Sequence, residues 1–385
     1  MPLLMPVYGT RPEAIKMAPL VSAIERNASF DQLVAVTGQH REMLDQVNEL
    51  FGIVPDVDLD IIQPRQTLAG ITEKALNGLT LAMEEHKPDA VIVQGDTTTS
   101  MVAALAAFYL QIPVFHVEAG LRSGQRYSPF PEEVNRKMTS QLASLHFAPT
   151  PLSRNNLLVE NIPAADVVVT GNTVIDALLE AVKHKVAFDD EALDAVADSG
   201  KPFILVTIHR RENQGEGMHD VGRALAEVAT RHPDWTIVLP AHRNPVVREA
   251  VLPYVESIDN VVVTEPIDYG RFTHLLSLCT FVLTDSGGIQ EEAPSLGKPV
   301  LVMRDNTERP EALSAGTVRL VGTGESRIVD ECERLITDPD WYASMANAVN
   351  PYGDGAATPR HLAAMEQFFG LGKRVDDFAP PDDAV

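Results

Sequence analysis

The chain has 385 residues, of which 45% are apolar and 22% are charged, and its formal net charge is −23. This length allows two domains with separate cores, and the composition is that of a globular enzyme. The acidic balance argues against nucleic-acid binding, which needs a basic surface, but a few well-placed cations could still hold an anionic ligand.

Cysteine usage and apolar runs predict a cytoplasmic protein. Cys279 and Cys332 lie in apolar surroundings without the spacing of a metal or redox site, so we expect buried, reduced thiols. The N-terminus lacks the basic region and cleavage site of a signal peptide. The longest apolar run, Met101–Val117, is broken by Gln111 and Pro113 and fails as a membrane span.

Short apolar runs alternate with helical patterns through the first half of the chain. These runs are continuously apolar, which is typical of parallel strands covered by helices on both faces. The predicted strands are Leu3–Tyr8, Leu33–Thr37, Ala90–Gln94, Val114–Val117, His146–Ala148 and Val167–Thr170. The predicted helices include Glu13–Glu25, Arg41–Leu50, Leu68–Glu85 and Thr98–Tyr109.

The second half repeats this scheme. The predicted strands are Phe203–Thr207, Thr236–Leu239, Val261–Thr264, Phe281–Thr284, Val300–Met303 and Val318–Val321. Two such series predict an α/β fold of two Rossmann-like, doubly wound domains, residues 1–182 and 183–355. The acidic stretch 183–200 is the candidate linker, and we expect a disordered tail over 374–385.

Polar clusters follow several predicted strands. In open α/β sheets, ligands bind beyond the carboxyl ends of the strands, so the expected active site is a cleft between the two domains. Arg11 and Lys16 flank a turn and a helix start, where amide groups and positive charge suit a phosphate. A turn with surface cations is the alternative.

Three carboxylates, Asp96, Glu118 and Glu132, are expected near neighbouring strand ends. Clustered carboxylates raise one another's pKa, so one can serve as an acid while another serves as a base. The alternatives are a helix cap for Asp96 and a solvated rim of charges for all three.

The second half offers groups suited to a pyrophosphate. His209 follows a strand and is next to Arg210 and Arg211, although pairing of these arginines with Glu212 is the structural alternative. The segment 284–300 runs from a strand through Ser286, Gly287 and Gly288 into a helix, which predicts a phosphate cradle. It lacks the lysine of an ATPase P-loop. Glu292 could grip two ribose hydroxyls.

Taken together, these motifs make the chain resemble the non-hydrolysing UDP-N-acetylglucosamine 2-epimerase family. The matching stretches run in order over most of the chain: GTRPEAIKMAP (9–19), GDTTTS (95–100), HVEAGLRSG (116–124), YSPFPEEVNR (127–136), TGNTVIDAL (170–178), HRREN (209–213), TDSGGIQEEAPSLGKPV (284–300), RDNTERPEA (304–312) and NPYGDG (350–355). Their joint specificity exceeds that of any single motif.

The resemblance implies a GT-B-like fold, UDP and UDP-GlcNAc as ligands, no cofactor, no metal, no nucleic acid or membrane partner, and a homodimer. It also implies that a C-terminal helix, about 356–371, packs on the first domain. The family's catalytic residues fall on Asp96, Glu118, Glu132 and His209. Its UDP-binding residues fall on Arg11, Lys16, Phe272, Ser286, Gly287, Gly288, Glu292 and Arg309.

Bacterial members resemble one another in a second UDP-GlcNAc site that activates the enzyme. Its positions would be Gln39, Glu42, Arg65 and His242. Glu42 departs from the expected glutamine, and a carboxylate there would weaken the binding of a diphosphate.

The expected reaction is the reversible epimerisation of UDP-GlcNAc to UDP-ManNAc for cell-surface polysaccharides, through elimination of UDP to 2-acetamidoglucal and its re-addition. Three alternatives remain: a GT-B glycosyltransferase that needs an acceptor, a hydrolysing 2-epimerase that releases free N-acetylmannosamine, and a non-catalytic sensor of UDP-sugars.

Overall fold

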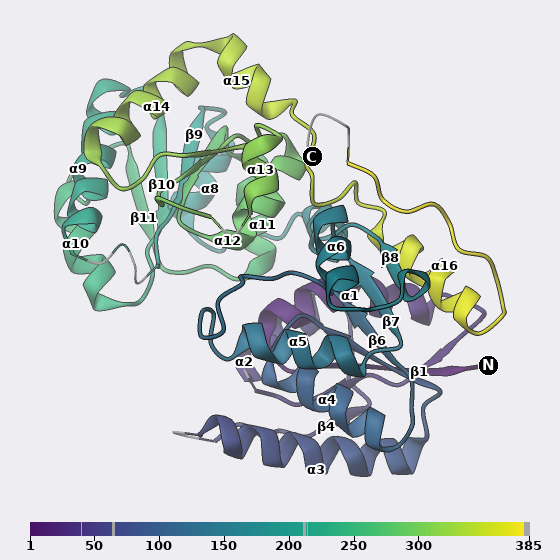
Figure 1. Cartoon of the computed structure of the whole chain (residues 1–385). Coiled ribbons are helices and arrows are strands. Elements are labelled where there is room, and N and C mark those ends of the chain that lie inside the picture. The colour runs from purple at the N-terminus through teal and green to yellow at the C-terminus, as the bar shows by residue number, and fades with distance from the viewer. Residues whose placement is uncertain (40, 64–65, 211–212, 214, 308, 381–385) are drawn as a thin grey trace. The chain divides into compact units, whose positions relative to one another are not determined.

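A computed structural model of the chain describes residues 1–39, 41–63, 66–210, 213, 215–307 and 309–380. The chain forms two compact units (Figure 1). The first combines Met1–Glu180 with Tyr352–Ala379, and the second spans Ala181–Pro351. Each unit is built around a parallel sheet.

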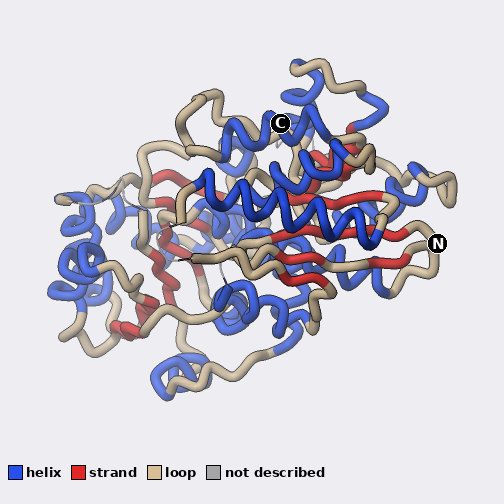
Figure 2. Tube along the Cα trace, turned by 90° about the horizontal axis from the view of Figure 1, so that it is seen from below, coloured by secondary structure: helices blue, strands red, loops and turns tan. Residues whose placement is uncertain are grey.

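The sheet of the first unit has the order β4-β3-β1-β5-β6-β7-β8, and β2 pairs with β1. Its strands lie side by side in Figure 2, where strands are red. The strands are β1 (Leu3–Tyr8), β2 (Asp31–Gln32), β3 (Ala35–Val36), β4 (Val57–Asp58), β5 (Ala90–Gln94), β6 (Val114–Val117), β7 (Leu145–Ala148) and β8 (Val167–Val169). The helices of this unit are α1 (Arg11–Glu25), α2 (Arg41–Phe51), α3 (Leu68–His86), α4 (Thr98–Tyr109), α5 (Glu132–Leu142), α6 (Pro151–Val159), α7 (Thr173–Ala181) and α16 (Ala357–Phe368).

A buried apolar cluster joins β1, β3, β5 and β6 to α3 and α4, with Met5, Leu79, Val91 and Val102 among its members. Of the predicted strand Leu33–Thr37, only Ala35–Val36 forms a strand, β3, and neither β2, just before it, nor β4 was predicted. Two-residue strands carry no apolar periodicity, so only their pairing with β1 and β3 defines them.

The sheet of the second unit has the order β11-β10-β9-β12-β13-β14. Its strands are β9 (Phe203–Thr207), β10 (Thr236–Pro240), β11 (Val261–Thr264), β12 (Phe281–Thr284), β13 (Val300–Val302) and β14 (Val318–Leu320). Its helices are α8 (Glu191–Asp198), α9 (Glu216–Arg231), α10 (Pro245–Val255), α11 (Tyr269–Leu278), α12 (Gly287–Glu292), α13 (Pro310–Ser314), α14 (Glu325–Thr337) and α15 (Pro339–Ala346).

The stretch 183–200, expected to be a linker, contains helix α8. Asp190 caps this helix by accepting hydrogen bonds from the N–H groups of Ala192 and Leu193, at 2.9 and 3.2 Å. Leu193 and Val196 are buried. Because only these two side chains need an apolar partner, the acidic remainder obscures the helix in the sequence.

Each sheet has one point at which the strand order reverses. In the first sheet the order turns at β1 and β5, and in the second it turns at β9 and β12. The loops that leave such neighbouring strands in opposite directions open a crevice where α/β proteins bind ligands. Of the predicted site residues, Arg11, Asp96, His209 and Ser286 follow these strands.

The C-terminal helix α16, yellow in Figure 1, packs on the first unit. The rings of Phe368 and Phe115 meet edge to face, with centroids 4.9 Å apart. Beyond the helix, Phe378 is buried and its N–H donates to the carbonyl of Val169 at 2.7 Å. Phe378, within the stretch predicted as a disordered tail, is thus held against β8; residues 381–385 lie outside the described residues.

Both cysteines are buried and free, as predicted, and burial raises the pKa of the Cys279 thiol to about 12. Within the described residues, no helix is long and apolar enough to cross a membrane. The same part of the chain contains no group of His, Cys, Asp and Glu side chains arranged to hold a metal ion.

Candidate active site

The predicted residues of the first unit follow strands at the carboxyl edge of its sheet. Arg11 begins α1 after the β1 turn, Asp96 follows β5, Glu118 follows β6, and Glu132 begins α5. Arg11 is exposed, whereas Glu118 is buried. Arg11 and Asp96 thus lie just after β1 and β5, the two strands at the reversal point.

Glu13 joins the turn after β1 to the loop that carries Asp96. Its buried carboxylate accepts hydrogen bonds from the N–H groups of Gly9 (3.1 Å) and Thr10 (2.8 Å) and from the Thr97 hydroxyl (2.6 Å). Burial raises the pKa of Glu13 to about 7 against these hydrogen bonds. This carboxylate fixes the start of α1 relative to the start of α4.

Glu118 is held by cations in a strained backbone position. Its φ of +62° is a left-handed conformation that a non-glycine residue adopts at a cost of about 1–3 kcal/mol. Its carboxylate pairs with Lys16 and accepts a hydrogen bond from Asn172 Nδ2 at 3.1 Å, and Arg136 Nη2 lies 3.7 Å away. Burial raises its pKa, but the charges of Lys16 and Arg136 outweigh burial and keep it low.

Arg136 links Asp96 to Glu118. Its Nη2 pairs with the Asp96 carboxylate while also lying close to Glu118. Its neighbour on α5, Asn135, donates from Nδ2 to the Asp96 carbonyl at 3.0 Å. Two side chains of helix α5 therefore position Asp96, one through its backbone carbonyl and one through its carboxylate.

Glu132 is the first residue of α5 and is half-buried. The preceding loop has cis peptide bonds at Ser128–Pro129 and Phe130–Pro131. The next residue, Glu133, is buried and accepts a hydrogen bond from the Ser123 N–H at 2.9 Å. Glu133 thus anchors the helix start at which Glu132 stands.

In the second unit, His209 and Asp285 meet at the reversal point between β9 and β12. His209 Nδ1 lies 2.9 Å from Asp285 Oδ1, and Asp285 is completely buried while His209 is 39% exposed. Burial raises the pKa of Asp285, but donation by His209 and by two backbone N–H groups outweighs it and lowers the pKa. The buried partner is therefore an anion. The predicted pairing of Arg210 and Arg211 with Glu212 involves residues 211 and 212, which are outside the described part.

The predicted phosphate cradle begins where β12 ends. Ser286 is the N-cap residue of α12, and Gly287 and Gly288 form the first turn of that helix. Glu292, at the end of α12, is buried and accepts a hydrogen bond from the Tyr269 hydroxyl at 3.1 Å.

Two further predicted nucleotide-binding residues, Arg309 and Phe272, belong to the same unit as the cradle. Arg309 Nε donates to Glu291 Oε1 at 2.6 Å, so a buried carboxylate holds this cation in place. Phe272 lies on α11 and is partly buried. Phe272 follows the Asp268 cap of that helix, which orients its first turn.

Residues 22–366 match the protein family described as UDP-N-acetylglucosamine 2-epimerase. The chain belongs to this family. It is 55% identical over 366 residues to the UDP-N-acetylglucosamine 2-epimerase of Escherichia coli strain K12, which covers 94% of this chain and 97% of that protein.

Solved structures of 2-epimerases agree. The chain is 48% identical to UDP-GlcNAc 2-epimerase from Neisseria meningitidis bound to UDP-GlcNAc, with a TM-score of 0.85 over 95% of this chain and 100% of that one. The enzyme from Methanocaldococcus jannaschii in complex with UDP-GlcNAc and UDP is 33% identical, with a TM-score of 0.76 over 96% and 100%. The predicted family and its GT-B-like fold class are confirmed.

The positions that the 2-epimerase resemblance assigns to an activating ligand lie in both units. Gln39 accepts a hydrogen bond from the Thr99 hydroxyl at 3.2 Å, and Glu42 is exposed in the first turn of α2. His242 belongs to the second unit, where its ring centroid is 6.2 Å from that of His209. Arg65 lies outside the described residues.

Sequence reasoning did not single out Arg136, Asn172 or Asp285, although each lies within a motif of the 2-epimerase family. Lys16 was predicted to bind nucleotide, and its described partner is Glu118. A signal was available, since Arg136 follows Glu132 by one helical turn on the same helix. Asn172 and Asp285 follow β8 and β12, the position relative to a strand at which other site candidates were predicted.

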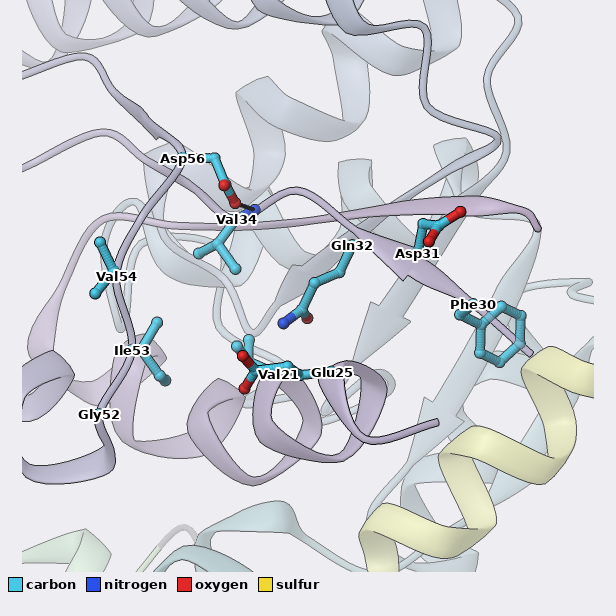
Figure 3. A pocket seen from close by; sticks show the side chains of 10 residues that line it. All are labelled: Val21, Glu25, Phe30, Asp31, Gln32, Val34, Gly52, Ile53, Val54 and Asp56. Atoms are coloured by element: carbon cyan, nitrogen blue, oxygen red, sulfur yellow. Dashed lines mark hydrogen bonds between the residues drawn. The ribbon is translucent and has the colours of Figure 1, made fainter. Parts of the chain in front are cut away.

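A separate hollow of about 370 Å³ lies between α1, β2 and the loop after α2 (Figure 3). Its lining includes Glu25, Gln32 and Ile53, and none of the predicted site residues. The side chains of Glu25 and Gln32 point toward one another, and Asp56 accepts a hydrogen bond from the Val34 N–H at 2.7 Å. This hollow is distinct from the carboxyl-edge residues described above.

Proposed function

We propose that this chain interconverts UDP-GlcNAc and UDP-ManNAc by inverting C2 of the sugar. Membership of the 2-epimerase family supports the reaction, and the relatives described above with UDP-GlcNAc or UDP bound support the ligands. The observation that carries the proposal is the partly buried cluster Asp96–Arg136–Glu118–Lys16 at the carboxyl edge of the first sheet.

The chemistry requires the bond to UDP to break first. C2 carries an acetamido nitrogen and no carbonyl, so its hydrogen is barely acidic. When the C1–O bond breaks, its electron pair leaves with UDP and an oxocarbenium-like centre forms. The C2 proton then passes to a base, which gives 2-acetamidoglucal. Protonation of C2 on the opposite face and attack of the UDP oxygen on C1 complete the inversion.

The first unit supplies the proton-transfer groups in this proposal. Two groups must act on opposite faces of the sugar, and they are drawn from Asp96, Glu118 and Glu132. Glu118 is supported as a group that stays ionised, since Lys16 and Arg136 lower its pKa. Arg11, exposed at the start of α1, would bind the departing diphosphate.

The second unit holds the UDP leaving group in this proposal. His209, Ser286 and Arg309 would stabilise the negative charge that develops on the pyrophosphate, and Glu292 would bind the ribose. They must also retain UDP, because its loss would turn epimerisation into hydrolysis. The resemblance names no metal or cofactor for these steps.

We further propose a cytoplasmic homodimer that supplies UDP-ManNAc for cell-surface polysaccharides, with UDP-GlcNAc activation through Gln39, Glu42, Arg65 and His242. Exposed apolar side chains on adjacent helices support self-association: Leu81 on α3 and Phe108 and Tyr109 on α4 are 54–66% exposed. Sedimentation equilibrium should give twice the mass of one chain, and a monomer at micromolar concentration would contradict the dimer.

Incubation with UDP-GlcNAc in D₂O, followed by NMR, tests the reaction directly. We expect UDP-ManNAc with deuterium at C2 and no requirement for an acceptor. Free N-acetylmannosamine would indicate the hydrolysing reaction, and turnover only with an acceptor would indicate a glycosyltransferase. No exchange and no turnover would indicate a sensor.

Replacing Arg11 with alanine should chiefly weaken UDP binding. A cation at a helix N-terminus adds a charge-assisted contact to a phosphate, worth about 1.5–3 kcal/mol. Titration calorimetry with UDP should show the loss, with Arg26, which ends the same helix as its C-cap, replaced by alanine as the control. Unchanged affinity of the Arg11 variant would remove Arg11 from the site.

A further inference from the structure

The buried carboxylate of Asp285 serves the loop that carries His209. Asp285 Oδ2 accepts hydrogen bonds from the backbone N–H groups of Arg210 (2.8 Å) and His209 (3.0 Å), and Asn213 Nδ2 lies at 3.3 Å. Oδ1 lies 2.9 Å from His209 Nδ1. With both oxygens engaged and no exposed surface, this carboxylate cannot turn away from the imidazole.

The pairing of strands brings these two residues together. β9 and β12 are neighbours in register, with Thr207 opposite Thr284, and their hydroxyls are 2.6 Å apart. The Asp285 N–H donates to the Thr207 carbonyl at 3.2 Å. The contact between Asp285 and His209 is therefore set by the sheet itself, at the point where the strand order reverses.

We propose that Asp285 is a positioning residue that holds the His209 imidazole with its hydrogen on Nδ1, so that Nε2 is the ring atom left to act on the substrate. This inference rests on the proposed role of His209 at the UDP leaving group. Asp285 itself touches no reacting atom.

The chemistry of the partners determines the tautomer. An ionised carboxylate only accepts hydrogen bonds, so Nδ1 must be the donor at 2.9 Å. The backbone N–H groups and His209 together keep the pKa of Asp285 low despite its burial, which supports the ionised form. A carboxylate that fixes the tautomer and direction of a histidine is a recurrent device in enzyme sites.

The neighbouring His242 uses the same ring nitrogen, Nδ1, as an acceptor instead of a donor. Its Nδ1 accepts a hydrogen bond from the Asn244 N–H at 3.1 Å, so that atom carries no hydrogen. The ring centroids of His209 and His242 lie 6.2 Å apart, and the two ring planes make an angle of 31°. Two adjacent imidazoles are thus bound through the same ring atom in opposite roles, and only His209 is held by a buried anion.

The tautomer can be measured without any assay of activity. In protein labelled with ¹⁵N-histidine, the His209 signals are identified among the 11 histidines by their loss in His209→Asn. We expect His209, when neutral, to carry its hydrogen on Nδ1, against the Nε2–H form that free histidine favours. A predominant Nε2–H form in the wild-type enzyme would overturn the inference, even if the enzyme is fully active.

Kinetics provide the second test. Asp285→Asn removes the charge and places an amide among N–H donors, so we expect kcat to fall about 10²-fold, the usual cost of a misplaced catalytic group, with KM for UDP-GlcNAc within about threefold. Combining it with His209→Asn should cost no more than His209→Asn alone. If the losses of kcat in the two single variants multiply in the double variant, Asp285 acts independently of His209.

Asp176→Asn is the matched control. Asp176 is also a buried carboxylate that accepts backbone hydrogen bonds, from Ala357 at 3.3 Å and Thr358 at 2.8 Å, but it holds no histidine. It should lower stability without changing the His209 tautomer. If Asp285→Asn does not fold, the ¹⁵N-histidine spectrum of the wild-type enzyme still shows which tautomer His209 adopts. Failure of the proposed function would appear separately, as absence of epimerisation by the wild-type enzyme.

Discussion

Changing Glu118 to glutamine, or Asp96 to asparagine, is expected to lower kcat by at least about 10²-fold, the usual contribution of a positioned acid or base. Both substitutions keep the size of the side chain and remove its ability to exchange a proton. Exchange of deuterium into C2, followed by NMR, should fall in parallel with epimerisation. Near-normal turnover by both variants would contradict the assignment.

Glu160→Gln is the control for this pair. Glu160 is a carboxylate of the same unit that also pairs with an arginine, Arg122, at 2.6 Å. The same change of charge beside a cation is made there without touching the cluster around Asp96. We expect this variant to keep kcat within about threefold, because Glu160 pairs with Arg122 and not with the cluster around Asp96.

Removal of Arg136 should affect both the rate and its pH dependence. Its guanidinium lies between Asp96 and Glu118 and is 12% exposed, so Arg136→Leu leaves two partly buried carboxylates facing each other. We expect kcat at neutral pH to fall about 10²-fold, because the reacting groups lose their alignment.

The pH profile gives the sharper readout. Glu118 has a lowered pKa in the folded enzyme, so it stays ionised until the pH falls below the usual range. Without Arg136, burial is opposed mainly by Lys16, and the pKa of Glu118 rises. The acidic limb of the plot of kcat against pH should therefore move to higher pH. The stability that ionised Glu118 contributes should likewise be lost at a higher pH as the solution is acidified.

Arg136→Lys and Arg122→Leu complete this test. Lysine keeps the positive charge but cannot span two carboxylates. Compared with Arg136→Leu, we expect Arg136→Lys to return the acidic limb toward its wild-type pH while recovering less of kcat. Arg122→Leu breaks a comparably buried pair and should destabilise the enzyme without moving the limb. An unshifted limb in Arg136→Leu would show that Arg136 does not control the ionisation of Glu118.

Much of the architecture is determined locally. The longer strands are continuous apolar runs, and α3 and α4 begin where they were predicted because Thr67 and Thr97 cap them. The predicted helix 98–109 coincides with α4. Apolar period and capping chemistry need only neighbouring residues, so the sequence alone determines them. The short strands, helix α8 and the anchored Phe378 depend on partners far along the chain.

The family could also be predicted from sequence, and the candidate site residues could be placed at the ends of predicted strands. Their partners could not. Lys16 pairs with Glu118 across 102 residues, Arg136 with Asp96 across 40, and the Asp285 carboxylate binds His209 across 76.

These pairings decide which carboxylates are ionised and how His209 is oriented. A pKa and a tautomer depend on charges and donors within a few ångströms, and spacing in the chain does not determine that distance. The sequence thus determined which chemical groups reach each sheet's carboxyl edge. The tertiary structure decided that Arg136 bridges two of them and that a buried Asp285 holds a third, because strand order and register bring these side chains into contact.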